Sequence, residues 1–64
     1  MYTIEYGAKG RRISMPGMPL ALVIARAEML ASQGAIDLRI IGRDGNAIDL
    51  AQFRLNYRRL LNEA

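Results

Sequence analysis

The sequence predicts one α+β domain with a two-layer ββαββα order, in which an antiparallel sheet carries two helices on one face. Two segments alternate apolar and polar residues on both sides of a glycine-containing turn, which is typical of β-hairpins. A segment rich in helix-forming residues follows each hairpin. The chain has 64 residues, which is enough for a single domain near the lower size limit for independent folding.

The first hairpin is predicted from residues 2–6 and 11–15, which both alternate with a period of two. A tight turn at Ala8-Lys9 would set Ile4 opposite Ile13. Because side chains alternate between the faces of a strand, this register places the apolar residues of both strands on one side. That side is expected to face the core.

Proline and glycine residues then separate the first hairpin from the first helix. Pro16 and Gly17 are expected to end the strand. Pro19 suits the first turn of a helix, where its missing N–H removes no hydrogen bond. Residues 20–33 are rich in Ala, Leu, Met and Glu, and Gly34 is a typical residue for ending the helix.

The second hairpin has the strongest turn signal in the chain. Residues 36–41 are short and rich in β-branched side chains, and the turn sequence Gly-Arg-Asp-Gly-Asn occupies residues 42–46. A type I turn with Gly45 in the left-handed region would pair Ile40 with Ile48.

A second helix is expected over residues 50–63, with Asp49 as its N-cap. The apolar stripes of both helices and both hairpins define the expected core. It comprises Tyr2, Ile4, Tyr6, Ile13, Val23, Ile24, Ala27, Leu30, Leu38, Ile40, Ile48, Leu50, Phe53, Tyr57 and Leu60.

The two halves of the chain resemble each other in their glycine spacing. Gly7-x-x-Gly10-x-x-Ile13 parallels Gly42-x-x-Gly45-x-x-Ile48, and a predicted helix follows each. An internal duplication explains this pattern, and so does the chance similarity of two glycine turns.

The composition removes several classes of chemistry. The chain has no Cys and no His, so disulfides, Cys/His zinc sites, thiolate nucleophiles and imidazole bases are impossible. Its six carboxylates have no spacing typical of a metal site or a catalytic dyad. We therefore expect no enzymatic activity, no cofactor and no metal.

Apolar runs in the sequence are too short to span a membrane, which takes about 18 residues or more. Residues 1–5 lack the basic and apolar regions of a signal peptide. These features predict a cytoplasmic protein, of a size and composition typical of bacterial or phage proteins.

The first predicted helix has apolar residues beyond its core stripe. Leu22, Ala25 and Met29 lie on its back, and Leu55 lies on the back of the second helix. A two-layer domain of this size cannot cover both sides of a helix. Small domains without disulfides or metals are often stabilised by oligomerisation. We therefore expect a protein-binding module that forms a homodimer or larger assembly, either through Leu22 and Met29 or through Leu55. We also expect it to bind another protein, in the manner of phage or mobile-element inhibitors and adaptors of similar size.

Arginine residues support an alternative function. The formal net charge is +3, and Arg54, Arg58 and Arg59 share the back of the second predicted helix. Such a face suits phosphate groups, and it is equally typical of a solvated surface. Binding of nucleic acid is therefore the alternative hypothesis.

Residues 40–53 resemble the GxxG segment of KH-type RNA-binding domains, in which an apolar pair precedes Gly-Arg-x-Gly and a helix follows. The resemblance implies that Gly42, Arg43, Asp44 and Gly45 clamp a nucleotide, with backbone close to a phosphate. It requires residues 37–41 to be helical, whereas a hairpin requires them to be extended.

Residues 21–48 are similar to a family of small bacterial domains of unknown function. Members of that family have a hairpin, a helix, a strand, a Gly-Arg/Lys-Asp-Gly turn and a further strand. The resemblance implies an extended segment at residues 37–41 and carries no function with it.

Overall fold

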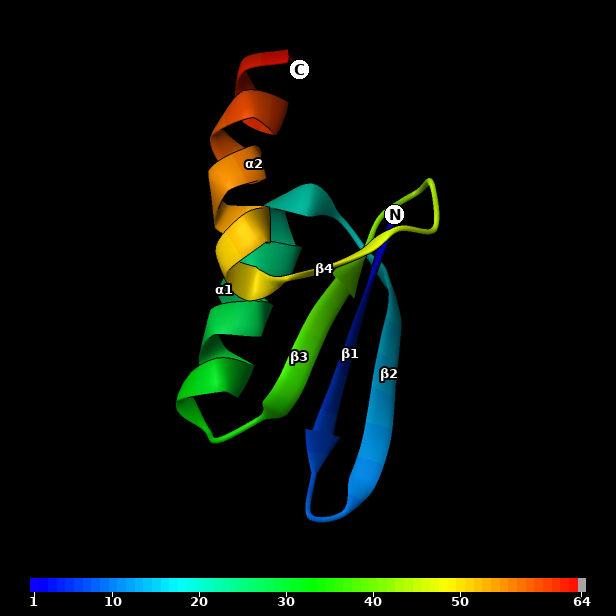
Figure 1. Cartoon of the computed structure of the whole chain (residues 1–64). Coiled ribbons are helices and arrows are strands. Elements are labelled where there is room, and N and C mark those ends of the chain that lie inside the picture. Colours follow the sequence, from blue (N-terminus) through cyan, green and yellow to red (C-terminus); the bar gives the residue numbers. More distant parts are fainter. Residues whose placement is uncertain (64) are drawn as a thin grey trace.

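A computed structural model describes the backbone of residues 1–63 and the side chains of residues 1–59. Its elements, in order, are β1 (Tyr2–Ala8), β2 (Arg11–Met18), α1 (Leu20–Ser32), β3 (Ile36–Ile41), β4 (Ala47–Asp49) and α2 (Leu50–Glu63) (Figure 1). The predicted ββαββα order is therefore confirmed.

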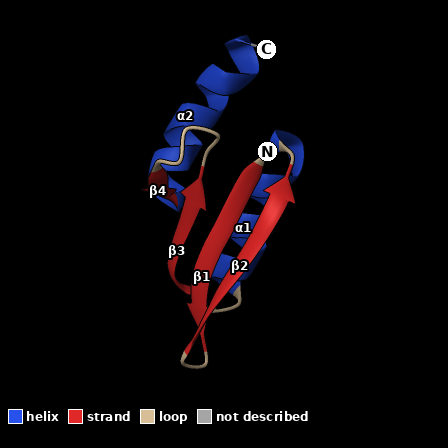
Figure 2. Ribbon diagram, turned by 90° about the vertical axis from the view of Figure 1, so that its right-hand side faces the viewer, coloured by secondary structure: helices blue, strands red, loops and turns tan. Residues whose placement is uncertain are grey.

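The four strands form one antiparallel sheet in the order β2-β1-β3-β4. The first strand of each hairpin lies at the centre, and the second strand of each hairpin forms an edge. Both helices lie on one face of the sheet, with α1 behind β1 and β2 in Figure 2 and α2 near β3 and β4. Two ββα units thus lie side by side, joined by the β1–β3 pairing.

The first hairpin turns at Lys9-Gly10, one residue later than predicted. Lys9 has φ 51° and Gly10 has φ 76°, which are the positive values that a type I′ turn requires. Ile4 therefore pairs with Met15, and Ile13 pairs with Tyr6. The predicted Ile4–Ile13 pairing was wrong by two residues, but a shift of two leaves every side chain on its predicted face.

The strand β2 continues to Met18, and the prediction that Pro16 ends it was wrong. A proline is tolerated there because β2 is an edge strand, so its missing N–H removes no bond of the sheet. Gly17 has φ 74° at an irregularity in the β1–β2 register. The extra residue returns Met18 to the helix side, where it pairs with Tyr2 and is only 7% exposed.

The helix α1 begins at Leu20 as predicted, with Pro19 as its extended N-cap, and it ends at Ser32, one residue earlier than predicted. The carbonyl of Pro19 accepts the first bonds of the helix. At the other end, Gly34 has φ 92°, the Ala35 amide donates to the Leu30 carbonyl at 3.0 Å, and the Gly34 amide donates to the Ala31 carbonyl at 3.2 Å. This is a Schellman motif, which turns the chain directly into β3.

The second hairpin confirms its predicted register. Ile40 pairs with Ile48, the Gly42 amide donates to the Asn46 carbonyl at 3.2 Å, and the Gly45 amide donates to the Gly42 carbonyl at 3.1 Å. Gly45 has φ 84°, as expected of a glycine that follows a type I turn in a bulged hairpin.

The helix α2 is capped by Asp49, as predicted. Its carboxylate oxygen Oδ1 accepts a hydrogen bond from the Gln52 amide at 2.8 Å. The start of α2 packs on the sheet, and its later turns extend past the sheet in both ribbon views (Figures 1 and 2).

The core is apolar and small. Phe53 is 2% exposed and makes an edge-to-face contact with Tyr2, with ring centroids 5.8 Å apart. Ile13 is half-buried and lies outside the core cluster, which corrects its prediction, and the side chain of Leu60 lies outside the described residues. Among the described side chains, the buried residues are Ile4, Met18, Val23, Ala27, Leu30, Ile40 and Phe53. The other predicted core residues with described side chains pack against them half-buried.

Candidate interaction surfaces

The outer side of α1 carries exposed apolar side chains. Leu22 and Met29 are each 42% exposed, and Ala25 between them is also exposed. The opposite side of the helix is occupied by the core residues Val23 and Ala27, which are both 0% exposed. The structure therefore leaves the predicted interface residues of α1 partly exposed.

An ion pair between the helices fixes the direction in which these side chains point. Arg54 Nε of α2 lies 3.5 Å from Glu28 Oε1 of α1, so Glu28 marks the side of α1 that faces α2. At about 100° per residue, Leu22 and Met29 lie about 100–120° around the helix from Glu28. They therefore lie on the flank of α1 away from α2, toward β2.

Leu55 forms a separate apolar spot. Its side chain is 75% exposed, more than any other described large hydrophobic residue. It lies about 100° around α2 from Arg54, the residue that faces α1. The helical geometry therefore places Leu55 apart from Leu22 and Met29, so the two predicted interfaces are separate surfaces.

The three predicted arginines of α2, Arg54, Arg58 and Arg59, are all exposed. Arg54 is engaged by Glu28 across the helix pair. Arg58 and Arg59 are exposed on successive residues, and therefore lie about 100° apart around the helix. Arg54, Arg58 and Arg59 therefore fall within an arc of about 140° on one side of α2, with Leu55 between the last two arginines.

The loop formed by Gly42, Arg43, Asp44 and Gly45 is a hairpin turn, because residues 37–41 belong to strand β3. Its hydrogen bonds are made within the loop. The Gly45 amide donates to the Gly42 carbonyl. The Asp44 carboxylate accepts from the backbone amide and the side chain of Asn46, at 3.1 and 3.0 Å. The Gly45 amide, which a phosphate-binding loop would offer to an anion, is therefore already used.

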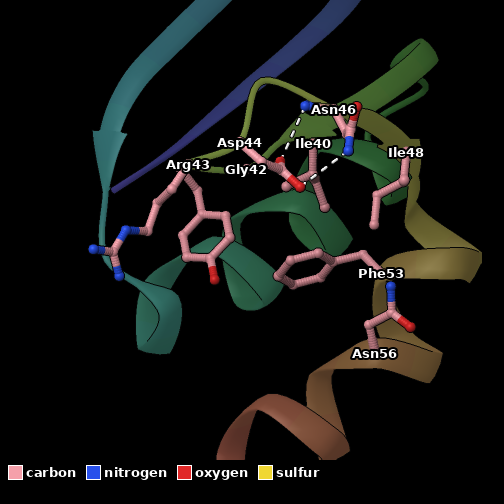
Figure 3. Close-up of a pocket in the computed structure, with 9 residues that line it drawn as sticks. Ile40, Gly42, Arg43, Asp44, Asn46, Ile48, Phe53 and Asn56 are labelled. Carbon is pink, nitrogen blue, oxygen red and sulfur yellow. Dashed lines mark hydrogen bonds between the residues drawn. The ribbon is translucent and has the colours of Figure 1, made fainter.

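A partly open hollow of about 410 Å³ lies between this turn and α2 (Figure 3). Its apolar lining comes from Tyr2, Ile40, Ile48 and Phe53, and its polar lining comes from Gly42, Arg43, Asp44, Asn46 and Asn56. The sequence gives no sign of this hollow, because the hollow forms only when α2 folds back on the second hairpin. It holds one carboxylate, that of Asp44, which accepts hydrogen bonds from Asn46.

The helix-free face of the sheet carries a network of charged side chains. Arg12 of β2 reaches across β1 to β3, where its Nη1 donates to the Asp37 carbonyl at 3.1 Å. Arg12 also lies 3.8 Å from Glu5, and Arg39 lies 3.7 Å from Asp37. Asp37 has φ 53° at a register irregularity between β1 and β3. These charges are exposed and paired, which favours a solvated face.

The described residues contain no group of three or more side chains able to hold a metal ion. Their buried side chains are all apolar. Among the described helices, none combines the length and the apolar character needed to cross a membrane.

No protein-family model, curated protein sequence or solved structure matches the chain.

Proposed function

We propose that this chain is a small, non-catalytic protein-binding module that associates with itself through the outer flank of α1. The observation that carries the proposal is the exposure of Leu22 and Met29, at 42% each, on a helix whose inner side already fills the core. Leucine and methionine lose favourable burial when they remain in water, by roughly 1.5–3 kcal/mol for each complete side chain. A partner surface would recover part of this free energy.

The shape of the chain supports the same proposal. Its accessible surface is 4529 Å², whereas a compact monomer of its mass is expected to expose about 4,100 Å². The principal extents of 37 × 21 × 16 Å describe an elongated molecule. A second chain on the exposed flank would reduce the excess surface.

The size and composition of the chain suit one class of protein-binding module. A module of this size, without Cys or His, suits an inhibitor or adaptor of the phage or mobile-element type, which acts by occupying a surface of another protein. This part of the proposal is an analogy from size and composition. It predicts that binding requires no cofactor and no metal.

Sedimentation or light scattering over a range of concentrations tests the association. We expect the wild type to form a dimer at micromolar to millimolar concentrations, and Leu22→Asp to weaken the dimer at least about 100-fold because a carboxylate would be buried at the interface. Leu55→Asp is the matched control on the other helix and should leave the dimer intact. A wild type that stays monomeric at millimolar concentration would show that self-association is wrong.

Nucleic-acid binding is the second candidate, and the exposure of Arg58 and Arg59 on α2 favours it. Contacts to phosphate are strongest at low salt. Binding to random RNA and DNA should therefore be measured at about 50 mM salt, with the double variant Arg58→Gln/Arg59→Gln as control. Binding by the wild type that the double variant loses would support this candidate, and no binding would remove it.

A further inference from the structure

Strand β2 is the long open edge of the sheet. It comprises eight residues, whereas β4 at the opposite edge comprises three. Long exposed edges present rows of unpaired backbone N–H and C=O groups and are templates for pairing with another strand. The flank of α1 that carries Leu22 and Met29 lies toward this same edge.

The register of the first hairpin identifies which backbone groups are open. In a two-residue hairpin the residues next to the turn are hydrogen-bonded to each other, and bonded pairs then alternate along the strands. The residues of β2 that bond to β1 are therefore Arg11, Ile13 and Met15. The backbone groups of Arg12 and Ser14 point outward.

The outward edge is short and self-complementary. Pro16 has no N–H, and Gly17 with φ 74° ends the regular part of β2, so the edge available for pairing is Arg11–Met15. The midpoint of this segment is Ile13. An antiparallel copy centred there sets Arg12 opposite Ser14 of the second chain, and every open donor and acceptor of both residues then has a partner.

Other registers satisfy fewer groups. Centring on Ser14 sets Arg12 opposite Pro16 of the other copy, which leaves the Arg12 carbonyl without a donor. Centring on Arg12 places the two arginines directly opposite each other, and like charges in such positions are unfavourable. The pairing centred on Ile13 avoids both problems.

The side chains are compatible with this pairing. Arginine or lysine often protects an edge strand, but Arg12 is drawn back over the sheet by Glu5 and by Asp37, whose carbonyl it contacts at 3.1 Å. On the helix side, pairing sets Ile13 against its copy. Ile13 is half-buried and outside the core, and Leu22 and Met29 of α1 are exposed on the same face of the sheet.

We propose that two copies join their β2 edges about a two-fold axis at Ile13, which makes one continuous eight-stranded sheet, with the α1 flanks meeting above it. The inference rests on the proposed self-association and adds its partner, its strand and its register. It names a second copy of this chain as the occupant of the edge.

Cysteine cross-linking tests the register directly, because the chain has no cysteine of its own. In Ile13→Cys the two sulfur-bearing residues would form a non-hydrogen-bonded pair with Cα atoms about 4.5 Å apart, within the range of a disulfide. In the control Met15→Cys the corresponding residues would lie four positions apart along the strand, about 13 Å. In a glutathione buffer at equilibrium, Ile13→Cys should form a covalent dimer and Met15→Cys should not.

A second variant tests the backbone bonds. Ser14→Pro removes an N–H that has no role in the β1–β2 pairing, so the monomer should keep its circular dichroism spectrum. The dimer dissociation constant should rise at least about tenfold, while Ser14→Ala, which keeps the N–H, should leave it unchanged.

The outcomes separate this inference from the proposed function. A wild-type dimer in which Ile13→Cys cross-links no better than Met15→Cys would overturn the β2 pairing and leave self-association standing. A monomeric wild type would overturn both. If Ser14→Pro fails to fold, the two cysteine variants still decide the register.

Discussion

The conformation of Lys9 gives the sharpest test of the hairpin register. Lys9 has φ 51°, a left-handed conformation that costs a side-chain-bearing residue about 1–2 kcal/mol. Asparagine adopts this conformation far more readily, and Asn-Gly is the preferred pair for a type I′ turn. Lys9→Asn should therefore stabilise the fold by about 0.5–1 kcal/mol. The entropy of unfolding is about 2.1 cal/mol/K per residue, so a chain of 64 residues should gain about 4–7 °C in Tm.

Thermal unfolding followed by circular dichroism measures this shift, at equal protein concentrations because dimer formation also changes Tm. Ala8→Asn is the matched control. If the turn lay at Ala8-Lys9, asparagine at residue 8 would stabilise it, whereas in the structure Ala8 is a strand residue paired with Arg11. Stabilisation by Ala8→Asn, or none by Lys9→Asn, would refute the register. The same result would remove the argument that Arg12 and Ser14 face the open edge.

Two further predictions concern the core and the second helix. Phe53→Ala should lower the free energy of unfolding by about 3–5 kcal/mol, because Phe53 is 2% exposed. This loss is comparable to the whole free energy of unfolding expected at this length, about 3–10 kcal/mol. The variant should therefore lose its cooperative thermal transition, and Asn56→Ala at the rim of the same hollow should keep it. Asp49→Ala should cost about 1 kcal/mol in urea denaturation because it removes the 2.8 Å cap on Gln52. Asp49→Asn should retain most of that stability, and equal losses in both variants would contradict the capping role.

Local sequence signals predicted those parts of the fold that depend on neighbouring residues. Gly34 and Gly45 sit at the predicted helix end and hairpin turn because both positions require positive φ, with values of 92° and 84°. The register of the first hairpin was missed because Gly7, Gly10 and the residues between them allow more than one tight turn. Choosing the glycine as the second loop residue, as type I′ turns favour, gives the observed Lys9-Gly10 turn.

The continuation of β2 could not be predicted without the sheet order. Pro16 forbids a central strand but is compatible with an edge, and the sequence does not say which strand lies at the edge. Met18 was missed for the same reason, since only the irregularity at Gly17 returns it to the core side. The exposure of Leu22 and Met29 was predictable, because helical periodicity is local. The hollow beside Asn56 was not, because it joins two segments through tertiary packing.

The asymmetry of the sheet is the reason that the proposed dimer uses the α1 side of the molecule. The two ββα units are arranged alike, with β1 and β3 paired at the centre, so the second strand of each unit forms an edge of the sheet. The edge at β4 is three residues long and leads directly into α2, which leaves little strand to pair. The edge at β2 is eight residues long. The side chain of Arg12 is held over the sheet by Glu5 and Asp37. On the helix side of the sheet, α1 exposes Leu22 and Met29. Unpaired backbone and uncovered apolar side chains therefore occur together on one side of the molecule. A strand partner alone would leave the two side chains in water, and a helix partner alone would leave the edge open. A second copy of the same side satisfies both.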